Sequence, residues 1–310
     1  MGARMSDVPW KPPDADLDPH AITERSGSNF LAGFLCLPRA RRHAMTVIYA
    51  FCRVVDDAVD DAPDVEVGRR QLAFWQQELS RCDGGEPQTP VGRALAEAVR
   101  DFGIPISALE DLIAGCAMDL DAEGIADQEQ LELYCYRVAS AVGLACLPAL
   151  GATSRGAEKF AYELGQALQF TNVLRDLRSD AEVDRCYVPK TWLAEFGLGP
   201  EDLSGAAGVP GAAVTAGLVG LCGRLAEIAR RRFAGARSAL RGLPLAERRA
   251  LVAPRIMGAI YGDLLRQLER RGGDISRPRA RVPRGRKIRL ALSVWAMFRH
   301  TLAAVQPTPP

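Results

Sequence analysis

The chain has 310 residues, of which 48% are hydrophobic and 25% are charged. This is the composition of an ordinary globular protein, and it excludes collagen-like repeats and extensive disorder. No uninterrupted apolar run reaches the roughly 18 residues of a membrane span. The first 20 residues also lack the apolar core of a secretory signal, so we expect a cytoplasmic protein.

The formal net charge is only +1, but the charges are unevenly distributed. Acidic residues dominate between positions 51 and 130, and arginines dominate between positions 221 and 300. The eight cysteines are scattered singly without a C-x-x-C pair, which favours reduced thiols over a zinc site or a disulfide framework. The basic C-terminal half carries no recognisable nucleic-acid-reading motif, so no nucleic-acid partner is expected. Nothing in the sequence indicates an obligate protein partner.

The order of predicted elements indicates an all-α protein. Residues 1–20 are rich in proline and aspartate, and we expect a disordered tail there. Beyond them, apolar residues recur with helical spacing and strand alternation is hard to find. The predicted helices cover residues 39–59, 64–80, 90–102, 107–120, 131–147, 155–179, 212–238, 245–271 and 285–298, with loops at 197–211 and 272–283. Ser154 is the expected N-cap of the helix that starts at Arg155. The sequence predicts one helical domain over residues 21–300 and a disordered tail at 301–310.

Two of these helices carry paired aspartates. The first contains Y-A-F-C-R-V-V-D-D-A-V-D-D from Tyr49, and the second contains L-Q-F-T-N-V-L-R-D-L-R-S-D from Leu168. Helical geometry places Asp56 and Asp60 on one face, and likewise Asp176 and Asp180. Like charges four residues apart destabilise a helix by a few tenths of a kcal/mol, so a compensating cation is expected.

The neighbouring residues favour one kind of cation. Hard oxygen ligands without nearby histidine or thiolate pairs suit Mg²⁺, which binds through a few carboxylates and substrate phosphates. Arg53 and Arg175 would add fixed donors for a diphosphate at the same place. Acidic helix ends are also common as solvated surfaces, and that interpretation is preferred for Asp61 and Asp64. Two copies of the pair inside apolar helices favour a functional site.

Several ordered motifs together resemble the squalene/phytoene synthase family of head-to-head prenyl synthases, over about residues 26–300. Besides the two aspartate motifs, they are S-x-N-F at Ser28–Phe30, L-P-R at Leu37–Arg39, Y-C-Y-R-V-A-S-A-V-G at Tyr134–Gly143, R-C-Y-V-P-K at Arg185–Lys190 and R-I-M-G-A-I-Y at Arg255–Tyr261. One departure concerns the second aspartate motif. The family often has D-x-x-E-D there, whereas this chain has Ser179 in place of the acidic neighbour.

The resemblance implies an isoprenoid synthase fold, with a helical bundle around a central cavity that binds two prenyl diphosphates. It also implies several Mg²⁺ ions bridged by the substrate diphosphate. The metal ligands would be Asp56, Asp60, Asn172, Asp176 and Asp180. The substrate contacts would be Phe30, Arg53, Tyr134, Gln169, Asn172, Arg175 and Tyr187. Tyr49, Arg53 and Tyr134 would act with the four aspartates in catalysis.

Softer features resemble the bacterial presqualene diphosphate synthases of hopanoid and squalene biosynthesis. They are A-S-A-V-G at Ala139–Gly143, G-C-A-M-D at Gly115–Asp119 and the basic segment from Arg281. The expected reaction joins two farnesyl diphosphates into presqualene diphosphate and releases diphosphate. The alternatives are a phytoene synthase using two geranylgeranyl diphosphates, a dehydrosqualene or squalene synthase, and a non-catalytic relative, which the intact aspartates disfavour. No Gly-rich dinucleotide fingerprint is visible, so NADPH is not expected.

Three further segments have expected roles. The apolar helix 131–147 suits the wall of a water-free tunnel. Its small residues would leave room for an isoprenoid tail at Ala139, Ala141, Gly143 and Ala145. Close packing between helices explains each small residue nearly as well. Tyr49 and Tyr134 are the better candidates for cation–π contact, whereas core packing is preferred for Phe30 and Phe51. The basic, apolar segment 284–300 suits either peripheral contact with the inner face of an anionic membrane or docking onto the core.

Overall fold

The computed structural model describes residues 11–25, 34, 37–121, 123–204 and 215–303, with residues 297–303 described by their backbone alone. Every regular element in this described part is helical, which confirms the predicted all-α class. The elements are α1 Pro19–Arg25, α3 Arg39–Asp60, α4 Val65–Arg81, α5 Pro90–Phe102, α6 Ile106–Met118, α7 Gln128–Cys135, the π-helix η1 Tyr136–Ser140, α8 Ala141–Leu150, α9 Arg155–Ala181, α10 Lys190–Phe196, α11 Pro200–Ser204, α12 Ala216–Gly242, α13 Leu245–Ala250, α14 Val252–Glu269 and α15 Arg284–Ala303.

The helix ends follow local sequence signals. Ser154 caps α9 as predicted, because its hydroxyl accepts the backbone N–H of Ala157 at 3.2 Å. Asp64 caps α4 in the same way, accepting from Val67 N–H at 2.8 Å, which confirms its structural interpretation. α5 begins with Pro90 after the N-cap Thr89 and ends at Gly103, whose φ of 70° is the left-handed conformation of a helix C-terminus.

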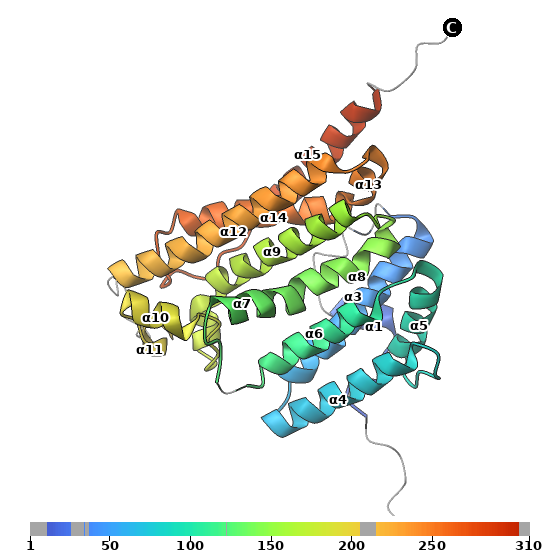
Figure 1. Cartoon of the computed structure of the whole chain (residues 1–310), viewed down its shortest axis with the longest axis horizontal. Helices are drawn as coiled ribbons and strands as arrows, with labels where there is room; N and C mark the ends of the chain where they lie inside the picture. Colours follow the sequence, from blue (N-terminus) through green and yellow to red (C-terminus); the bar gives the residue numbers. More distant parts are fainter. Residues whose placement is uncertain (1–10, 26–33, 35–36, 122, 205–214, 304–310) are drawn as a thin grey trace, which may run out of the picture.

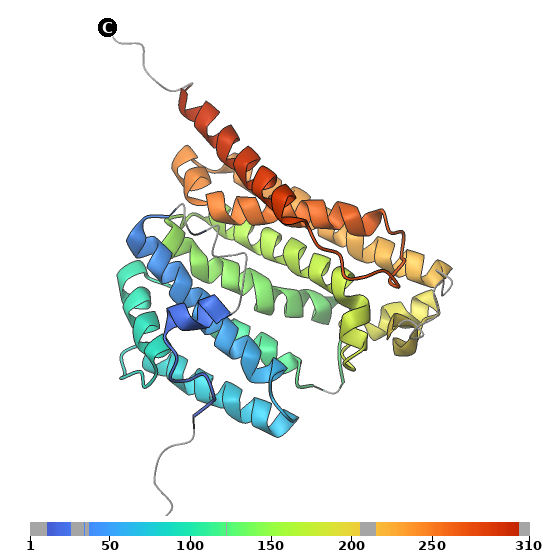
Figure 2. The same cartoon turned by 180° about the vertical axis from the view of Figure 1, so that it is seen from behind.

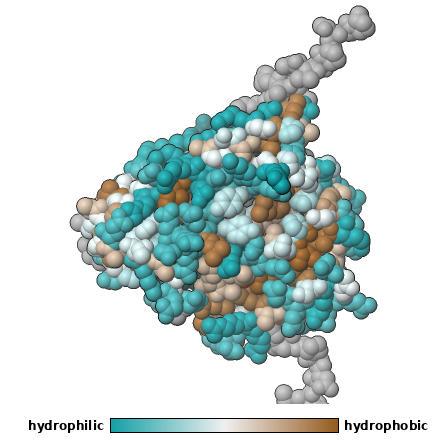
Figure 3. Space-filling view, in the orientation of Figure 1, coloured by the Kyte–Doolittle hydropathy of each residue, from teal (hydrophilic) through white to brown (hydrophobic). Residues whose placement is uncertain are grey.

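The long helix α9 is the central element, and α7, η1, α8, α11, α12 and α14 pack against it. Figure 1 shows α9 between α12 on one side and the α7–η1–α8 stretch on the other, with α3, α4 and α6 forming the far side. Seen from the same side, the surface is largely hydrophilic, with smaller apolar groups between (Figure 3). One continuous set of buried side chains runs from α1 through α12 and supplies the core, including Phe51, Trp75, Phe170 and Leu225. This core continues into α14 and to Val282, and a separate small cluster of Val252, Ile256 and Val294 joins α14 to α15.

Two predicted helices are interrupted. The predicted helix 131–147 is α7 and α8 joined by η1, and π-helical turns of this kind are often found at functional sites. The predicted helix 245–271 breaks at Leu251 into α13 and α14. Pro254, in the first turn of α14, has no backbone N–H to donate the hydrogen bond that would continue α13. The break therefore falls just before it. The full stretch Gln128–Leu150 is long and apolar enough to cross a membrane, yet it contacts α6 and α9 in the core.

Other predicted boundaries also need correction. Residues 11–20 are not disordered: turns precede α1, Ala15 is fully buried, and α1 packs against α3 (Figure 2). The segment expected to be a loop at 197–211 contains the short helix α11 at Pro200–Ser204, and α10 ends just before it at Phe196. Residues 205–214 lie outside the described residues. The backbone of α15 continues to Ala303, past the predicted end of the domain. The cysteines in the described part are all free thiols, as predicted.

Candidate active site

A cavity of about 600 Å³ lies between α3, α6, the α7–η1–α8 stretch, α9 and α14. The C-terminal halves of α3 and α9 supply its polar lining, and their N-terminal halves supply apolar lining such as Met45, Ile48, Leu164 and Leu168. The cavity thus combines a charged region with an apolar one. A molecule with an anionic head and a hydrocarbon tail matches this arrangement.

All the predicted site residues within the described part of the chain line this one cavity. They are Tyr49, Arg53, Asp56 and Asp60 on α3, Tyr134 on α7, Gln169, Asn172, Arg175, Asp176 and Asp180 on α9, and Tyr187 in the segment after α9. Phe30 lies outside the described residues. Two segments more than 100 residues apart in sequence therefore meet across a shared cavity.

The first aspartate pair is only partly compensated. Arg53 on the same helix donates to Asp56 at 3.2 Å and to Asp57 at 2.9 Å. Burial, and then repulsion from Asp60, nevertheless raises the pKa of Asp56 to about 7. This carboxyl group is held where the charged form is disfavoured, and a bound cation would reverse that preference.

The two carboxyl groups of the second pair have pKa values shifted in opposite directions. Burial acts to raise the pKa of Asp176, but hydrogen bonds from Arg175 and from Arg279 bring that pKa below its ordinary value. Arg279 donates two bonds to Asp176, at 2.6 and 2.7 Å, and Arg175 also donates two, from Nε at 2.8 Å and from Nη2. Among the described residues no arginine donates a hydrogen bond to Asp180, and burial followed by repulsion from Asp176 raises its pKa to about 7.

Arg185 joins the two pairs. Its Nη1 atom lies 2.5 Å from Oδ1 of Asp60, and its charge partly opposes the rise in the pKa of Asp180. In total, five carboxylates and four guanidinium groups line the cavity. The arginines are therefore positioned both to balance the aspartates and to bind phosphate oxygens.

The sequence reasoning missed four site residues: Asp119, Arg185, Tyr261 and Arg279. Asp119 at the end of α6 accepts a hydrogen bond from the Tyr187 hydroxyl at 2.8 Å. The rings of Tyr134 and Tyr187 stack with their centroids 4.9 Å apart. Burial raises the pKa of Asp119 to about 6, although the Tyr187 hydrogen bond acts to lower it. The sequence did contain a signal for three of them, because the motifs quoted above include Asp119, Arg185 and Tyr261.

Two of the four small residues expected in the apolar wall line the cavity. Ala139 of η1 and Gly143 of α8 line the cavity, together with Val138 and Val142. Ala141 and Ala145 are fully buried in the core and do not line it, so close packing explains those two. Phe51 is also fully buried and packs edge to face against Trp75, as predicted for a core residue.

The residues present fit a divalent cation held jointly with a diphosphate. Among the residues described, no three His, Cys, Asp or Glu side chains converge into a ready metal site. Mg²⁺ commonly uses only one or two protein carboxylates and takes its other ligands from phosphate and water. The side-chain oxygen of Asn172 is buried and accepts no hydrogen bond, although Asn172 donates to Gln169 at 3.1 Å. One helical turn separates it from Asp176, so an unused hard oxygen ligand lies where the second pair would need one.

Comparisons with known proteins agree with this geometry. The Squalene/phytoene synthase family model matches residues 23–286. A presqualene diphosphate synthase of Rhodopseudomonas palustris is 36% identical over 267 residues, covering 86% of this chain and 91% of that protein. A phytoene synthase of Mycobacterium tuberculosis is 34% identical over 248 residues, covering 78% of this chain and 77% of that protein. The crystal structure of a dehydrosqualene synthase superposes with a TM-score of 0.76 at 27% identity, covering 91% of this chain and 95% of the other.

Proposed function

We propose that this chain, which belongs to the squalene/phytoene synthase family of prenyltransferases, joins two molecules of farnesyl diphosphate head to head and makes presqualene diphosphate. The observation that carries the proposal is the meeting of Asp56 and Asp60 with Asp176 and Asp180 in one cavity that also has an apolar lining. The presqualene diphosphate synthase at 36% identity over most of both chains supports the C15 donor.

The proposed reaction begins when the bond between carbon 1 and oxygen of one farnesyl diphosphate breaks, and its electron pair leaves with the diphosphate. The double bond of the second molecule attacks the allylic cation, and loss of a proton closes the cyclopropane ring. The second molecule keeps its diphosphate. The products are then presqualene diphosphate, inorganic diphosphate and one proton.

The chain's own residues have distinct tasks in this reaction. Arg53, Arg175, Arg185 and Arg279 bind phosphate oxygens and hold the head groups at the charged end of the cavity. The wall around Val138 and Val142 excludes water, which would otherwise convert the cation to an alcohol. The stacked rings of Tyr134 and Tyr187 offer an electron-rich surface beside Asp119.

We assign the cation ligands to Asp56, Asp60, Asn172, Asp176 and Asp180, with Mg²⁺ as the metal, in line with a family that is typically Mg²⁺-dependent. Bound Mg²⁺ would neutralise the diphosphate and help it leave as an anion. The donor set supports a hard cation, because it consists of carboxylate and amide oxygens.

The decisive experiment supplies the purified protein with Mg²⁺ and either farnesyl or geranylgeranyl diphosphate, with and without NADPH, and measures product masses. The expected product is presqualene diphosphate from the C15 donor, unchanged by NADPH. Phytoene or its cyclopropyl precursor from the C20 donor alone would instead favour the phytoene synthase alternative, which the Mycobacterium relative makes worth testing. Asp176→Asn is expected to lower turnover at least a hundredfold while the helical circular dichroism stays unchanged.

We also propose that α15 contacts the inner face of the cytoplasmic membrane, where a lipophilic product would partition. One side of α15 docks onto α14: Val294 is buried there, and Arg286 donates to Asp263 at 2.8 and 2.6 Å. The opposite side leaves Ile288 and Leu292 exposed, with the exposed cations Arg284 and Arg289 nearby. Docking onto the core and contact with a membrane are thus compatible, because they use different faces of α15.

A further inference from the structure

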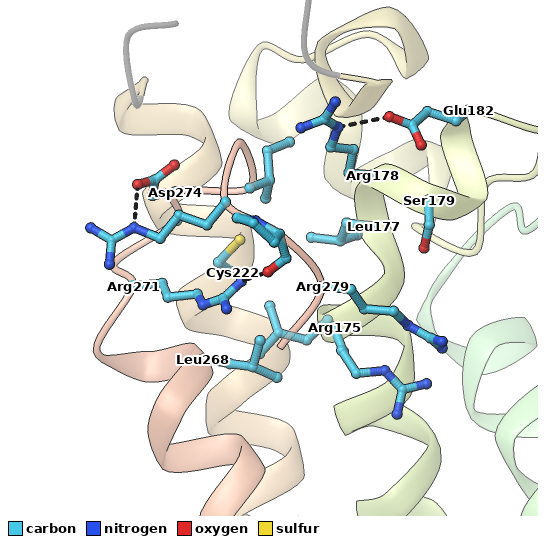
Figure 4. Close-up of a pocket in the computed structure, with 15 residues that line it drawn as sticks. Arg175, Leu177, Arg178, Ser179, Glu182, Cys222, Leu268, Arg271, Asp274 and Arg279 are labelled. Carbon is cyan, nitrogen blue, oxygen red and sulfur yellow. Dashed lines mark hydrogen bonds and ion pairs between the residues drawn. The ribbon is translucent and has the colours of Figure 1, made fainter. Parts of the chain in front are cut away.

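A second cavity, of about 300 Å³, lies on the other side of Arg175 and Arg279 from the aspartate pairs. It is enclosed by the C-terminal part of α9, by α12, by the end of α14 and by the segment 271–279. Figure 4 shows Arg271 and Asp274 on one side of it and the side chains of Arg175 and Arg279 on the other, with the heads of these two arginines pointing away from Arg271. Because both arginines line both cavities, the second cavity is the immediate neighbour of the proposed diphosphate site.

Cations outnumber anions around this second cavity. Among the described residues, its lining includes five arginines but only two acidic residues, Glu182 and Asp274. Each of these carboxylates is engaged by one arginine: Arg178 bonds Glu182 at 2.8 Å, and Arg277 bonds Asp274 at 2.7 Å. Arg175 and Arg279 share Asp176, which lines the first cavity. The lining therefore holds an excess of positive charge.

Arg271 is the least compensated of these cations. Its Nη1 atom donates to the carbonyl of Pro278 at 2.9 Å, and within the described part of the chain it forms no ion pair. Burial, and then repulsion from Arg277, lowers the pKa of Arg271. A guanidinium group in such surroundings gains most from an anionic ligand, since the ligand replaces both lost hydration and the missing counter-charge.

Ser179 contributes to the same imbalance. It lines the second cavity, and its hydroxyl donates to the carbonyl of Asp176 at 3.1 Å instead of supplying a charge. A glutamate at this position, as in the D-x-x-E-D pattern, would place a third carboxylate in the lining. The serine of this chain thus keeps the cavity cationic.

The geometry points to a second anion site in this cavity, one that takes inorganic diphosphate. The inference rests on the proposed function, which releases that anion on the other side of Arg175 and Arg279. A diphosphate leaving the first cavity would pass these two guanidinium groups and meet Arg178 and Arg271 next. Diphosphate matches the site better than phosphate, because its two phosphoryl groups can engage two arginines at once.

The test is calorimetric titration of inorganic diphosphate into the full-length protein in EDTA, where the aspartates of the first cavity disfavour anions. We expect one equivalent to bind, with inorganic phosphate at least tenfold weaker. Arg271→Gln and Ser179→Glu should each weaken diphosphate binding at least tenfold, the first by removing a cation and the second by adding a carboxylate. Arg100→Gln, at an exposed arginine of α5 paired with Asp101, is the matched control and should bind as the wild type does.

Wild-type affinity in both Arg271→Gln and Ser179→Glu, or no binding to the wild type, would overturn the inference. Phosphate binding as tightly as diphosphate would overturn the choice of ligand. If Arg271→Gln does not fold, Ser179→Glu still decides the matter, because it leaves all five arginines in place. The titration needs no prenyl donor, so it is separable from the proposed function: a chain that binds diphosphate here but makes no condensation product refutes only that function.

Discussion

Asp56 and Asp180 are the residues whose ionisation the fold opposes most clearly. Their pKa values of about 7 lie well above the ordinary 3.8, because burial and a neighbouring aspartate disfavour the charged form. Between about pH 4 and pH 7 the folded state therefore binds more protons than the unfolded state. The free energy of unfolding, measured in EDTA, should fall as the pH rises through this window. Burial of these carboxyl groups thus reduces stability, and the proposed function explains it as the cost of a cation site.

Asp56→Asn should separate the effect of this carboxyl group on stability from its effect on activity. Since asparagine cannot ionise, the variant is expected to be more stable than the wild type at pH 8 in EDTA and no more stable at pH 4. The gain should be about 1 kcal/mol, because solvent in the cavity reaches about half of the Asp56 side chain (49% exposed) and screens its charge. Urea unfolding at the two pH values measures it. Condensation activity should be lost in the same variant.

The exposed Asp61, one turn further along, is the matched control. Asp61→Asn should leave both the pH dependence and the activity as in the wild type. Equal stabilisation by the two substitutions would show that general charge reduction, and not burial in the cavity, explains the effect.

At the scale of single elements, the sequence predicted what depends on local periodicity. The helices and the placement of each aspartate pair on one helix face follow from the spacing of residues along one segment. Both are present in the structure. Arg279 could not be found in this way, because it lies in a Pro- and Arg-rich loop and reaches Asp176 only through tertiary packing. The break at Leu251 did have a local signal in Pro254. The π-helix had none, because its position depends on a neighbouring helix.

The neighbouring helix α9 contacts η1 and approaches it closely at Gly165. A Cβ atom there would lie 2.5 Å from Cα of Ser140 and 2.6 Å from its backbone nitrogen, so the backbone itself would have to move. Gly165→Ala is therefore expected to destabilise the protein by about 1–3 kcal/mol, as overpacking does. It should also lower turnover, since Gln169 and Asn172 lie one and two turns further along the same helix. Thermal unfolding and steady-state kinetics measure the two effects.

Gly223 in α12 provides the opposite case. It is exposed, and a Cβ atom there meets nothing within 4 Å. Gly223→Ala should stabilise the protein by about 0.5–1 kcal/mol through helix propensity alone. If the two alanine variants behaved alike, the close approach of α9 to η1 would not be the cause of the destabilisation.

At the scale of the whole molecule, the proposed membrane contact of α15 needs a test that leaves the fold intact. Deleting this helix would also expose the apolar contact between Val294 and the residues Val252 and Ile256, so truncation is a poor test of membrane binding. Replacing only the outward-facing residues avoids that problem. Ile288→Ser combined with Leu292→Ser should reduce co-sedimentation with anionic vesicles at least fivefold while thermal stability stays unchanged.

Val183→Ser is the control for that experiment, because Val183 is a more exposed apolar residue in a different part of the chain. It should sediment as the wild type does. Equal binding of the wild type and the double variant to anionic vesicles, or equal binding of the wild type to anionic and zwitterionic vesicles, would remove α15 from the account of localisation.

The joint use of both aspartate pairs is tested most directly by anomalous diffraction from crystals containing Mn²⁺ in place of Mg²⁺ and an unreactive thiolo analogue of farnesyl diphosphate. The account predicts anomalous peaks within about 2.5 Å of carboxylate oxygens of both pairs, Asp56 with Asp60 and Asp176 with Asp180, with the analogue's phosphates completing the coordination. Peaks at only one pair, or only outside the cavity, would contradict it.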